Sequence, residues 1–222
     1  MTARTRTRPR TIQEAYDAMS GWYDLLAGWG EGLVERQALL MLSAREGEDI
    51  LELGPGTGRA LSALAGAVGA SGRLCGVDLS TGMLRRARQR LAREGQARRV
   101  AFLCGDAAHL PLRASSADAA LSILTLEVLD PDGIAQALAE CRRVLRPGGR
   151  MVAAALVEGK RRRPAVRLYR WARDRYPLWV NCRPIRLRPL LVGAGFHVVD
   201  AASTSVWGLP VEIVLATSPM PR

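Results

Sequence analysis

The chain has few aromatic residues and lacks both long apolar runs and paired cysteines. Aromatic residues make up 5% of the 222 residues, although 48% of the chain is apolar. No stretch reaches the roughly 18 uninterrupted apolar residues of a membrane-spanning helix. The N-terminus has no apolar segment of signal-peptide type. These absences predict a globular protein that is soluble or attached to a membrane surface.

The spacing of the cysteines argues against a metal site. Four are present, and none forms a C-x-x-C pair or has a histidine at metal-binding spacing. Cys75 and Cys104 fall inside predicted strands. We therefore expect reduced thiols in a cytoplasmic protein and no metal site. The cysteines are Cys75, Cys104, Cys141 and Cys182.

Positively charged residues outnumber negatively charged ones. The formal net charge is +11, and it comes overwhelmingly from arginine, which suits phosphate, carboxylate or an anionic membrane surface. A genome that favours arginine codons would give the same excess, so charge alone is a weak argument. Residues 1–11 are rich in arginine and threonine and predict a disordered basic tail. Residues 12–222 fit a single domain.

Alternating patterns along the chain predict an α/β fold. Residues 12–44 are helix-like, and Gly21, Gly28 and Gly30 are expected to break them into shorter helices. Short apolar strands then alternate with helices, which indicates a parallel sheet covered on both faces. The link between the last two strands is too short for a crossover helix, so this pair is expected to be antiparallel. The predicted strands span residues 50–53, 74–77, 100–103, 119–124, 151–156, 197–200 and 211–216.

The most informative segment, residues 51–61, couples an apolar run to Gly54, Gly56 and Gly58 and then to a helical pattern. Glycines at alternate positions let the backbone approach a ligand closely. A dinucleotide site would need G-x-G-x-x-G, but the third glycine position is Arg59 or Leu61, depending on the register. An ordinary glycine-rich turn remains the competing interpretation of this segment taken alone.

Four ordered motifs together resemble the class I S-adenosylmethionine (SAM)-dependent methyltransferases. Glu52 and the three glycines match E-x-G-x-G-x-G, Asp78 ends the second strand, G-D-A follows the third at 105–107, and R-V-L-R-P-G-G spans 143–149. The resemblance implies a Rossmann-like seven-stranded, mostly parallel sheet with a C-terminal antiparallel hairpin and N-terminal helices. It also implies SAM as the cofactor. R-V-L-R-P-G-G is expected to be structural.

The resemblance assigns cofactor contacts by position. Asp78 lies at the strand edge where open α/β sheets bind ligands, and it is expected to accept both ribose hydroxyls. Ser80 is expected to cap the next helix. Asp106 is expected to accept from the adenine amine, and Ala107 to supply a backbone contact. The expected cofactor-binding residues are Glu52, Gly54, Pro55, Gly56, Thr57, Gly58, Asp78, Leu79, Asp106 and Ala107.

No catalytic residue is assigned. Glu127 and Asp130 follow the fourth strand, but helix N-terminal charge or a solvated loop is the favoured interpretation. His109, beside a proline turn, is expected to be a surface or packing residue rather than a catalyst. Tyr16 and Tyr23 lie on helices that fold over the cofactor in similar enzymes. Core packing explains their spacing equally well.

Residues 160–191 form an insertion with ten arginines interleaved with aromatic residues. Apolar positions between 165 and 176 share one helical face, and the residues that fall largely opposite are Arg163, Arg167, Arg170 and Asp174. This basic amphipathic helix is typical of a substrate lid or of contact with an anionic membrane. The lid is favoured. Nucleic-acid binding ranks lower, because no RNA-binding module accompanies the charge.

The sequence therefore predicts a cytoplasmic methyltransferase that acts on a small-molecule or lipid-like acceptor. Within the family, it most resembles the ubiquinone/menaquinone C-methyltransferase branch. A quinone-type ring carbon is the first candidate acceptor, and an amine is the second. The alternative is a non-catalytic SAM-binding protein whose basic arm recruits membrane, RNA or protein. A nicotinamide dehydrogenase is disfavoured by the failed glycine register.

Overall fold

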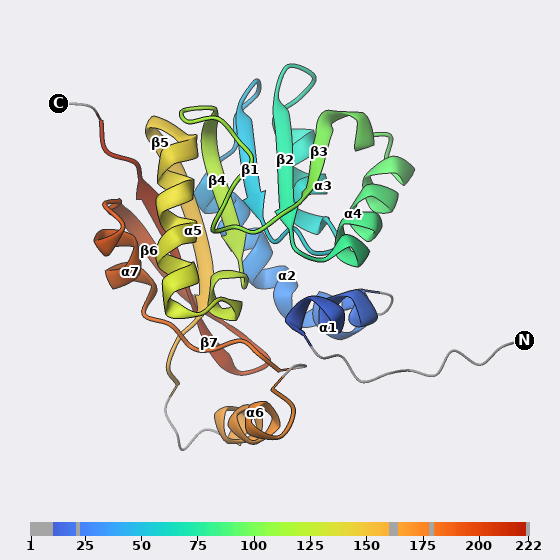
Figure 1. Cartoon of the computed structure of the whole chain (residues 1–222), viewed down its shortest axis with the longest axis vertical. Coiled ribbons are helices and arrows are strands. Elements are labelled where there is room, and N and C mark those ends of the chain that lie inside the picture. The colour runs from blue at the N-terminus through green and yellow to red at the C-terminus, as the bar shows by residue number, and fades with distance from the viewer. Residues whose placement is uncertain (1–10, 21–22, 160–163, 178–179, 221–222) are drawn as a thin grey trace, which may run out of the picture.

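A seven-stranded sheet runs through the computed structural model, with helices against both of its faces (Figure 1). The structure describes residues 11–20, 23–159, 164–177 and 180–220. The expected basic tail lies outside the described residues except for its last member, Thr11. The Thr11 side chain accepts a hydrogen bond from the Glu14 amide and caps the first helix. The first described helix therefore begins at this cap.

The strand order is β3-β2-β1-β4-β5-β7-β6. Neighbouring strands from β3 through β5 are parallel, whereas β7 runs antiparallel to both β5 and β6. The predicted mostly parallel sheet with a closing antiparallel hairpin is confirmed. The strands are β1 Asp49–Leu53, β2 Arg73–Asp78, β3 Val100–Cys104, β4 Ala117–Ile123, β5 Leu145–Leu156, β6 His197–Val206 and β7 Leu209–Thr217.

Several strand boundaries differ from the prediction, and three of them have a clear structural cause. β5 begins at Leu145 rather than 151, so Pro147, Gly148 and Gly149 lie inside the strand, where its pairing with β4 shifts register. β4 ends at Ile123 because Leu124 takes a positive φ of 53°. β6 extends to Val206, because it pairs with β7 along its full length. Pairing with a neighbouring strand, which is not visible in a single strand's sequence, sets the limits of β5 and β6, whereas the backbone conformation of Leu124 ends β4.

Helices connect the strands, and one of them corrects a prediction. α2 runs without interruption through Gly28 and Gly30, although each glycine lowers helix propensity. At Gly30 a Cβ atom would lie 2.3 Å from the Trp207 indole nitrogen, so this glycine allows close packing instead of ending the helix. Gly21 falls outside the described residues. The helices are α1 Ile12–Met19, α2 Tyr23–Leu42, α3 Arg59–Ala67, α4 Thr81–Arg93, α5 Pro131–Val144, α6 Pro164–Arg175 and α7 Leu187–Gly193, with 3-10 turns at Ala97–Arg99 and Leu126–Val128.

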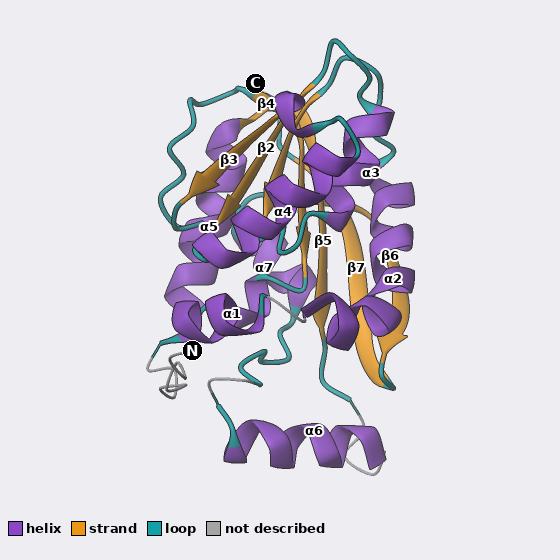
Figure 2. Cartoon of the chain, turned by 90° about the vertical axis from the view of Figure 1, so that its right-hand side faces the viewer, coloured by secondary structure: helices purple, strands orange, loops and turns teal. Residues whose placement is uncertain are grey.

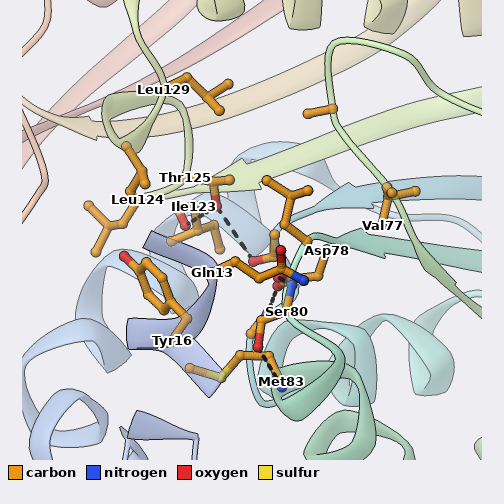
Figure 3. A pocket seen from close by; sticks show the side chains of 16 residues that line it. Gln13, Tyr16, Val77, Asp78, Ser80, Met83, Ile123, Leu124, Thr125 and Leu129 are labelled. Atoms are coloured by element: carbon orange, nitrogen blue, oxygen red, sulfur yellow. Dashed lines mark hydrogen bonds between the residues drawn. The ribbon is translucent and has the colours of Figure 1, made fainter. Parts of the chain in front are cut away.

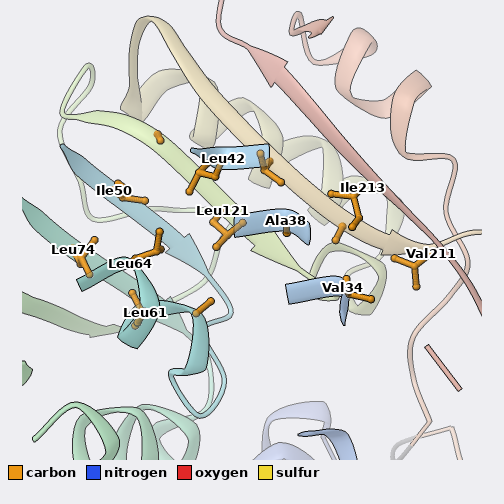
Figure 4. Packing of buried hydrophobic residues seen from close by; sticks show 14 of the residues in the cluster. Val34, Ala38, Leu42, Ile50, Leu61, Leu64, Leu74, Leu121, Val211 and Ile213 are labelled. Carbon is orange, nitrogen blue, oxygen red and sulfur yellow. The ribbon is translucent and has the colours of Figure 1, made fainter. Parts of the chain in front are cut away.

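Two apolar layers bury the faces of the sheet. Residues of α2 and α3, including Val34, Ala38 and Leu64, pack on one face (Figure 4). Residues of α5 and α7 form the second layer on the other face. Leu61 and Leu64 are almost fully buried, and truncation of such a leucine to alanine typically costs about 2–5 kcal/mol. These layers hold the strand ends rigidly in place.

Ion pairs close the edge of the sheet where β1 begins. Arg146 contacts both Asp49 and Asp118, and Arg73 pairs with Asp49 at 2.8 Å. Hydrogen bonds from Arg73 hold the pKa of Asp49 below its usual value, despite an opposing effect of burial and with a further contribution from Arg146. The segment R-V-L-R-P-G-G therefore has a structural role, as predicted, and lies far from the ligand-binding strand ends.

No helix within the described residues has the length and hydropathy needed to cross a membrane.

Candidate active site

A pocket lies at the carboxyl ends of β1, β2 and β4, with α1 over it (Figures 2 and 3). Open α/β sheets bind their ligands at this edge. Five expected cofactor residues line the pocket: Gly54, Gly56, Asp78, Leu79 and Ala107. Its other lining residues are Gln13, Tyr16, Val77, Ser80, Met83, Gly105, Ile123, Leu124, Thr125, Val128 and Leu129.

The glycine loop needs its glycines for two different reasons. Gly54, Gly56 and Gly58 all have positive φ values, of 64°, 53° and 80°. A Cβ at Gly54 would lie 2.3 Å from the Thr125 hydroxyl, and one at Gly58 would lie 2.8 Å from Ala87. At Gly56 a Cβ would meet nothing within 4 Å. The outer two glycines therefore allow close packing, and the middle one presents bare backbone to the pocket.

Asp78 is held at the pocket by backbone amides. Its carboxylate accepts hydrogen bonds from the Ser80 amide at 2.8 Å and the Gly56 amide at 3.3 Å. Burial raises the pKa of Asp78 to about 6, although both amides act in the opposite direction. The Ser80 hydroxyl accepts from the Met83 amide and caps α4, as the sequence predicts. Capping and ligand binding are thus divided between Ser80 and Asp78.

A single carboxylate holds α1 over this pocket. Asp17 accepts hydrogen bonds from the Ser80 hydroxyl at 2.6 Å and from the Gly82 amide at 2.7 Å. A Cβ at Gly82 would lie 2.8 Å from the same carboxylate oxygen, so only glycine permits this approach. The contact places Gln13 and Tyr16 in the pocket wall. The side chain of Tyr23 lies outside the described residues.

The remaining residues of the glycine loop motif lie behind the pocket wall. Glu52 is buried in β1, and burial, with Glu35 and Asp78 nearby, raises the pKa of its carboxyl to about 8. Its Oε2 has no hydrogen-bond partner among the described residues. Thr57 is buried, and its carbonyl accepts from the Arg90 guanidinium. Pro55, Thr57 and Gly58 shape the loop, whereas Glu52 carries an unsatisfied acceptor beneath it.

Asp106 occupies a different environment from the expected one. Its carboxylate accepts from the Ala108 amide at 2.9 Å, which closes a local turn, and its side chain is 49% exposed. The pocket wall next to it is made by Gly105 and Ala107. His109 is exposed on the same turn, in agreement with a surface role. The described geometry thus brings the backbone of this turn closer to the pocket than the Asp106 carboxylate.

The sequence analysis did not predict the part of the pocket wall that follows β4. Ile123, Leu124, Thr125, Val128 and Leu129 line the pocket, and they follow a strand that lies beside β1 in the sheet. Leu124 holds a positive φ, an uncommon conformation for leucine that is found at functional sites. The order β2-β1-β4 could have pointed to this segment, because the switch in strand order falls at β1.

A second cavity of about 460 Å³ lies next to the first and shares Tyr16 and Leu124 with it. Its wall is mostly apolar, and α6 contributes Ala165, Leu168, Tyr169 and Ala172. The predicted helix at 165–176 is thus present as α6, and it covers this cavity. The other described lining residues are Met19, Glu31, Glu127, Leu156, Val180, Cys182, Val206, Trp207 and Leu209.

The position of Glu127 differs from the one that the sequence analysis favoured. It is completely buried in this second cavity, rather than being a solvated loop charge. Burial raises the pKa of its carboxyl to about 8. Asp130 does behave as favoured, because its carboxylate accepts from the Gly133 amide and caps α5. The burial of Glu127 depends on α6 and the C-terminal hairpin, which lie far from it in sequence.

Comparison with known proteins agrees with this geometry. Residues 50–149 match the methyltransferase domain family. The ubiquinone/menaquinone biosynthesis C-methyltransferase UbiE of Paracoccus denitrificans is 32% identical over 166 residues, which are 74% of this chain and 62% of that protein. Over this domain the chain is similar to the class I SAM-dependent methyltransferases.

Other relatives extend the range of this methyltransferase family. O-methyltransferase cnsE of Penicillium expansum is 36% identical over 166 residues, which are 74% of this chain and 58% of that protein. The chain thus spans about three fifths of the length of these two relatives. The crystal structure of the [4+2]-cyclase SpnF has a TM-score of 0.75 at 19% identity and covers 95% of this chain and 98% of its own. That likeness shows the fold alone.

The strand-end pocket fits the cofactor of the methyltransferase family. Gly56 exposes backbone toward open space, and Asp78 provides a fixed carboxylate at the edge of the sheet. Leu79, 44% exposed, offers an apolar surface in the same wall. The unpartnered Glu52 oxygen adds an acceptor under the loop. When bound, SAM supplies a methyl group on a positively charged sulfonium.

Proposed function

We propose that this chain is a methyltransferase that holds SAM at the ends of β1, β2 and β4 and methylates a small, mostly apolar acceptor. The observation that carries the proposal is the second cavity, which shares Tyr16 and Leu124 with the strand-end pocket. An acceptor in one space would therefore lie beside a cofactor in the other.

In this proposal, the pocket residues bind the cofactor by position. The glycine loop, with Pro55 and Thr57 behind it, approaches through its backbone, and Asp78 accepts from the ribose hydroxyls. Leu79 and Ala107 flank the adenine, with Asp106 at the rim. Glu52 acts from beneath the loop. The burial of Glu52 and the positions of Gly56, Asp78 and Ala107 in the pocket wall support the assignment.

The chain's contribution to the reaction is mainly positioning. Holding an acceptor atom in line with a donor about 3–3.5 Å away can lower a barrier by around 7 kcal/mol or more. α6 covers the acceptor cavity through Ala165, Tyr169 and Ala172, with Leu168 at its exposed edge, and a cover of this kind excludes competing water. This placement supports a lid. Trp171, which is 60% exposed and absent from the cavity wall, leaves an outer face for contact with an anionic membrane as the alternative.

The names of the relatives include carbon and oxygen as acceptor atoms, whereas the amine candidate rests on the cavity. One relative is a C-methyltransferase of quinone biosynthesis, and another is an O-methyltransferase. A quinone-type ring carbon and an amine both fit an apolar cavity that contains a carboxyl group. The competing class is a SAM-binding protein without transferase activity.

Methyl transfer can be tested without knowing the acceptor. The purified protein is incubated with methyl-labelled SAM and a cell extract, and the label is separated into lipid-soluble, small aqueous and macromolecular fractions. We expect enzyme-dependent label in the lipid-soluble or small aqueous fraction. Tight SAM binding with no label in any fraction would contradict methyltransferase activity and favour the non-catalytic alternative.

A further inference from the structure

Glu127 has an unusual position for a carboxyl group. It is fully buried, and its Oε1 accepts a hydrogen bond from the Leu156 amide at 3.2 Å. Its Oε2 is buried with no partner among the described residues. An unsatisfied buried acceptor lowers stability, because the hydrogen bonds it makes with water in the unfolded chain are not replaced. Because Glu127 lines the second cavity, a molecule bound there can supply the missing donor.

The cavity around Glu127 offers acceptors rather than donors. Glu31 of α2 brings a second carboxyl into the wall, and no lysine, arginine or histidine is among the described lining residues. The Tyr169 hydroxyl donates to the Cys182 carbonyl at 2.5 Å, and the Tyr16 hydroxyl donates to the Asn181 side chain at 3.3 Å. Both tyrosine protons are therefore committed within the protein. In a chain with a net charge of +11, this cavity disfavours an anionic ligand.

Aromatic side chains complete the wall. Tyr16 of α1, Tyr169 of α6 and Trp207 of the β6–β7 turn all line the cavity, although aromatic residues are only 5% of the chain. Aromatic rings attract cations, and they form the sites that recognise alkylated ammonium groups. Carboxyl oxygens together with aromatic rings form a set of contacts suited to an ammonium group on an apolar skeleton.

We propose that the second cavity binds an apolar amine as its ammonium form, with Glu127 Oε2 accepting an N–H hydrogen bond; this rests on the proposed methyltransferase function. Within the site, the ammonium N–H bond breaks and a Glu127 O–H bond forms. The nitrogen keeps the electron pair that a methyl acceptor needs. Glu127 therefore selects the acceptor and takes up its proton.

The buried state of Glu127 predicts a proton signal on binding. Burial, with Glu31 nearby, raises the pKa of the carboxyl to about 8, so without a ligand Glu127 is mostly protonated at neutral pH. The ammonium ion displaces this proton from Oε2, which becomes an acceptor only when the carboxyl group is ionised. The other titratable groups among the described lining residues are the Tyr16 hydroxyl, the Tyr169 hydroxyl and the Cys182 thiol, and the pKa values of the last two are raised. An ammonium ion favours the carboxylate. Amine binding at pH 7 should therefore release a proton, and the affinity should increase as the pH rises from 6 to 8.

Three probes of one shape test the proposal: 1-naphthylmethylamine, 1-naphthalenemethanol and 1-naphthoic acid. Calorimetric titration of the full chain at pH 7.5 should show the amine binding at least about tenfold more tightly than the alcohol, a typical gain from a charge-assisted hydrogen bond. The acid should bind most weakly. Glu127→Gln, of nearly the same shape, should reduce the preference for the amine to about twofold and abolish proton release. Asp132→Asn, at an exposed acid on α5, is the matched control and should keep both.

The outcomes separate this proposal from the function on which it rests. Circular dichroism and SAM titration of Glu127→Gln confirm that the variant is folded and that its cofactor pocket is intact. If the alcohol or the acid binds as tightly as the amine while labelled methyl transfer is observed, the amine proposal is wrong and the methyltransferase function stands. An amine preference that persists in Glu127→Gln also contradicts the role of Glu127. A wild-type chain that binds no SAM contradicts the proposed function itself.

Discussion

Three buried carboxyl groups lie near the strand ends, and their surroundings distinguish their roles. Asp78 receives two backbone hydrogen bonds and faces the first pocket. Glu52 lies under the glycine loop with one unpartnered oxygen, and Glu127 faces the second cavity with another. Because unpartnered buried oxygens are costly, each is a position where a ligand contact would compensate.

Asp78→Ala should weaken SAM binding by about tenfold to a hundredfold, the range expected when a charge-assisted hydrogen bond is lost. The lost carboxylate lies at the pocket, and Ser80 still caps α4, so the protein should remain folded. Calorimetric titration with SAM and thermal unfolding measure the two effects. Asp130→Ala, which removes a cap on α5 away from the pocket, is the control. Unchanged SAM affinity in Asp78→Ala would remove this residue from the site.

At the residue scale, the sequence predicts what depends on local spacing. The glycine loop, Asp78 and the Ser80 cap follow from the few residues around them. The burial of Glu127 depends on α6 and the hairpin, so no local pattern could reveal it. Asp106 was expected from the motif, but the side chain is engaged by its own turn.

α6 is the element that most affects the acceptor cavity. Its half-buried side chains Tyr169 and Ala172 line the cavity, and the Tyr169 hydroxyl donates a hydrogen bond to the Cys182 carbonyl. Trp171 points away from the cavity wall and contacts Tyr176 edge to face, with ring centroids 6.3 Å apart. One helix therefore has a covering face and an outer aromatic face.

Tyr169→Phe removes the hydrogen bond to Cys182 while keeping the ring. We expect severalfold weaker binding of 1-naphthylmethylamine, with SAM affinity unchanged, because only the cover of the second cavity is loosened. Calorimetry with the two ligands measures this split. Trp171→Ala on the same helix is the control and should leave both affinities unchanged. If Trp171→Ala instead abolishes co-sedimentation of the protein with anionic vesicles, membrane contact rather than lid closure is the main role of α6.

Element by element, the sequence pattern was reliable where periodicity was strong. The helix expected at 165–176 is present as α6, and the alternating strands form the expected sheet. The error at Gly28 and Gly30 arose because tertiary packing outweighs helix propensity: Gly30 is required by Trp207, which lies 177 positions further along the chain. The early start of β5 likewise depends on pairing with β4.

For the whole molecule, the raised pKa values predict how stability depends on pH. The pKa values of Glu52 and Glu127 are both about 8, against 4.5 for an ordinary glutamate. Below about pH 4.5 both the folded and the unfolded states hold these protons. Between pH 4.5 and 8 the unfolded chain loses them while the folded chain keeps them, so stability falls as pH rises. A pKa that is higher by one in the folded state changes the free energy of unfolding by about 1.4 kcal/mol across this range.

The ligand-free protein should therefore unfold at a lower temperature at pH 8 than at pH 5. Asp49 and Glu140 have lowered pKa values, so they affect stability only at more acidic pH. Glu52→Gln should flatten the decline, and Glu46→Gln, at an exposed acid, should not. Differential scanning calorimetry across this pH range makes the comparison. A wild-type unfolding temperature that rises from pH 5 to pH 8 would contradict the assigned burial of these carboxyls.

We propose that the ends of β1, β2 and β4 form a SAM site beside an acceptor cavity. Equilibrium titration of the purified chain with SAM and, in parallel, with NAD tests it most directly. We expect saturable binding of one SAM per chain and no comparable binding of NAD, because the spacing of the glycines in the loop does not match the dinucleotide motif. Preferential binding of NAD, or no binding of SAM to folded protein, would contradict it.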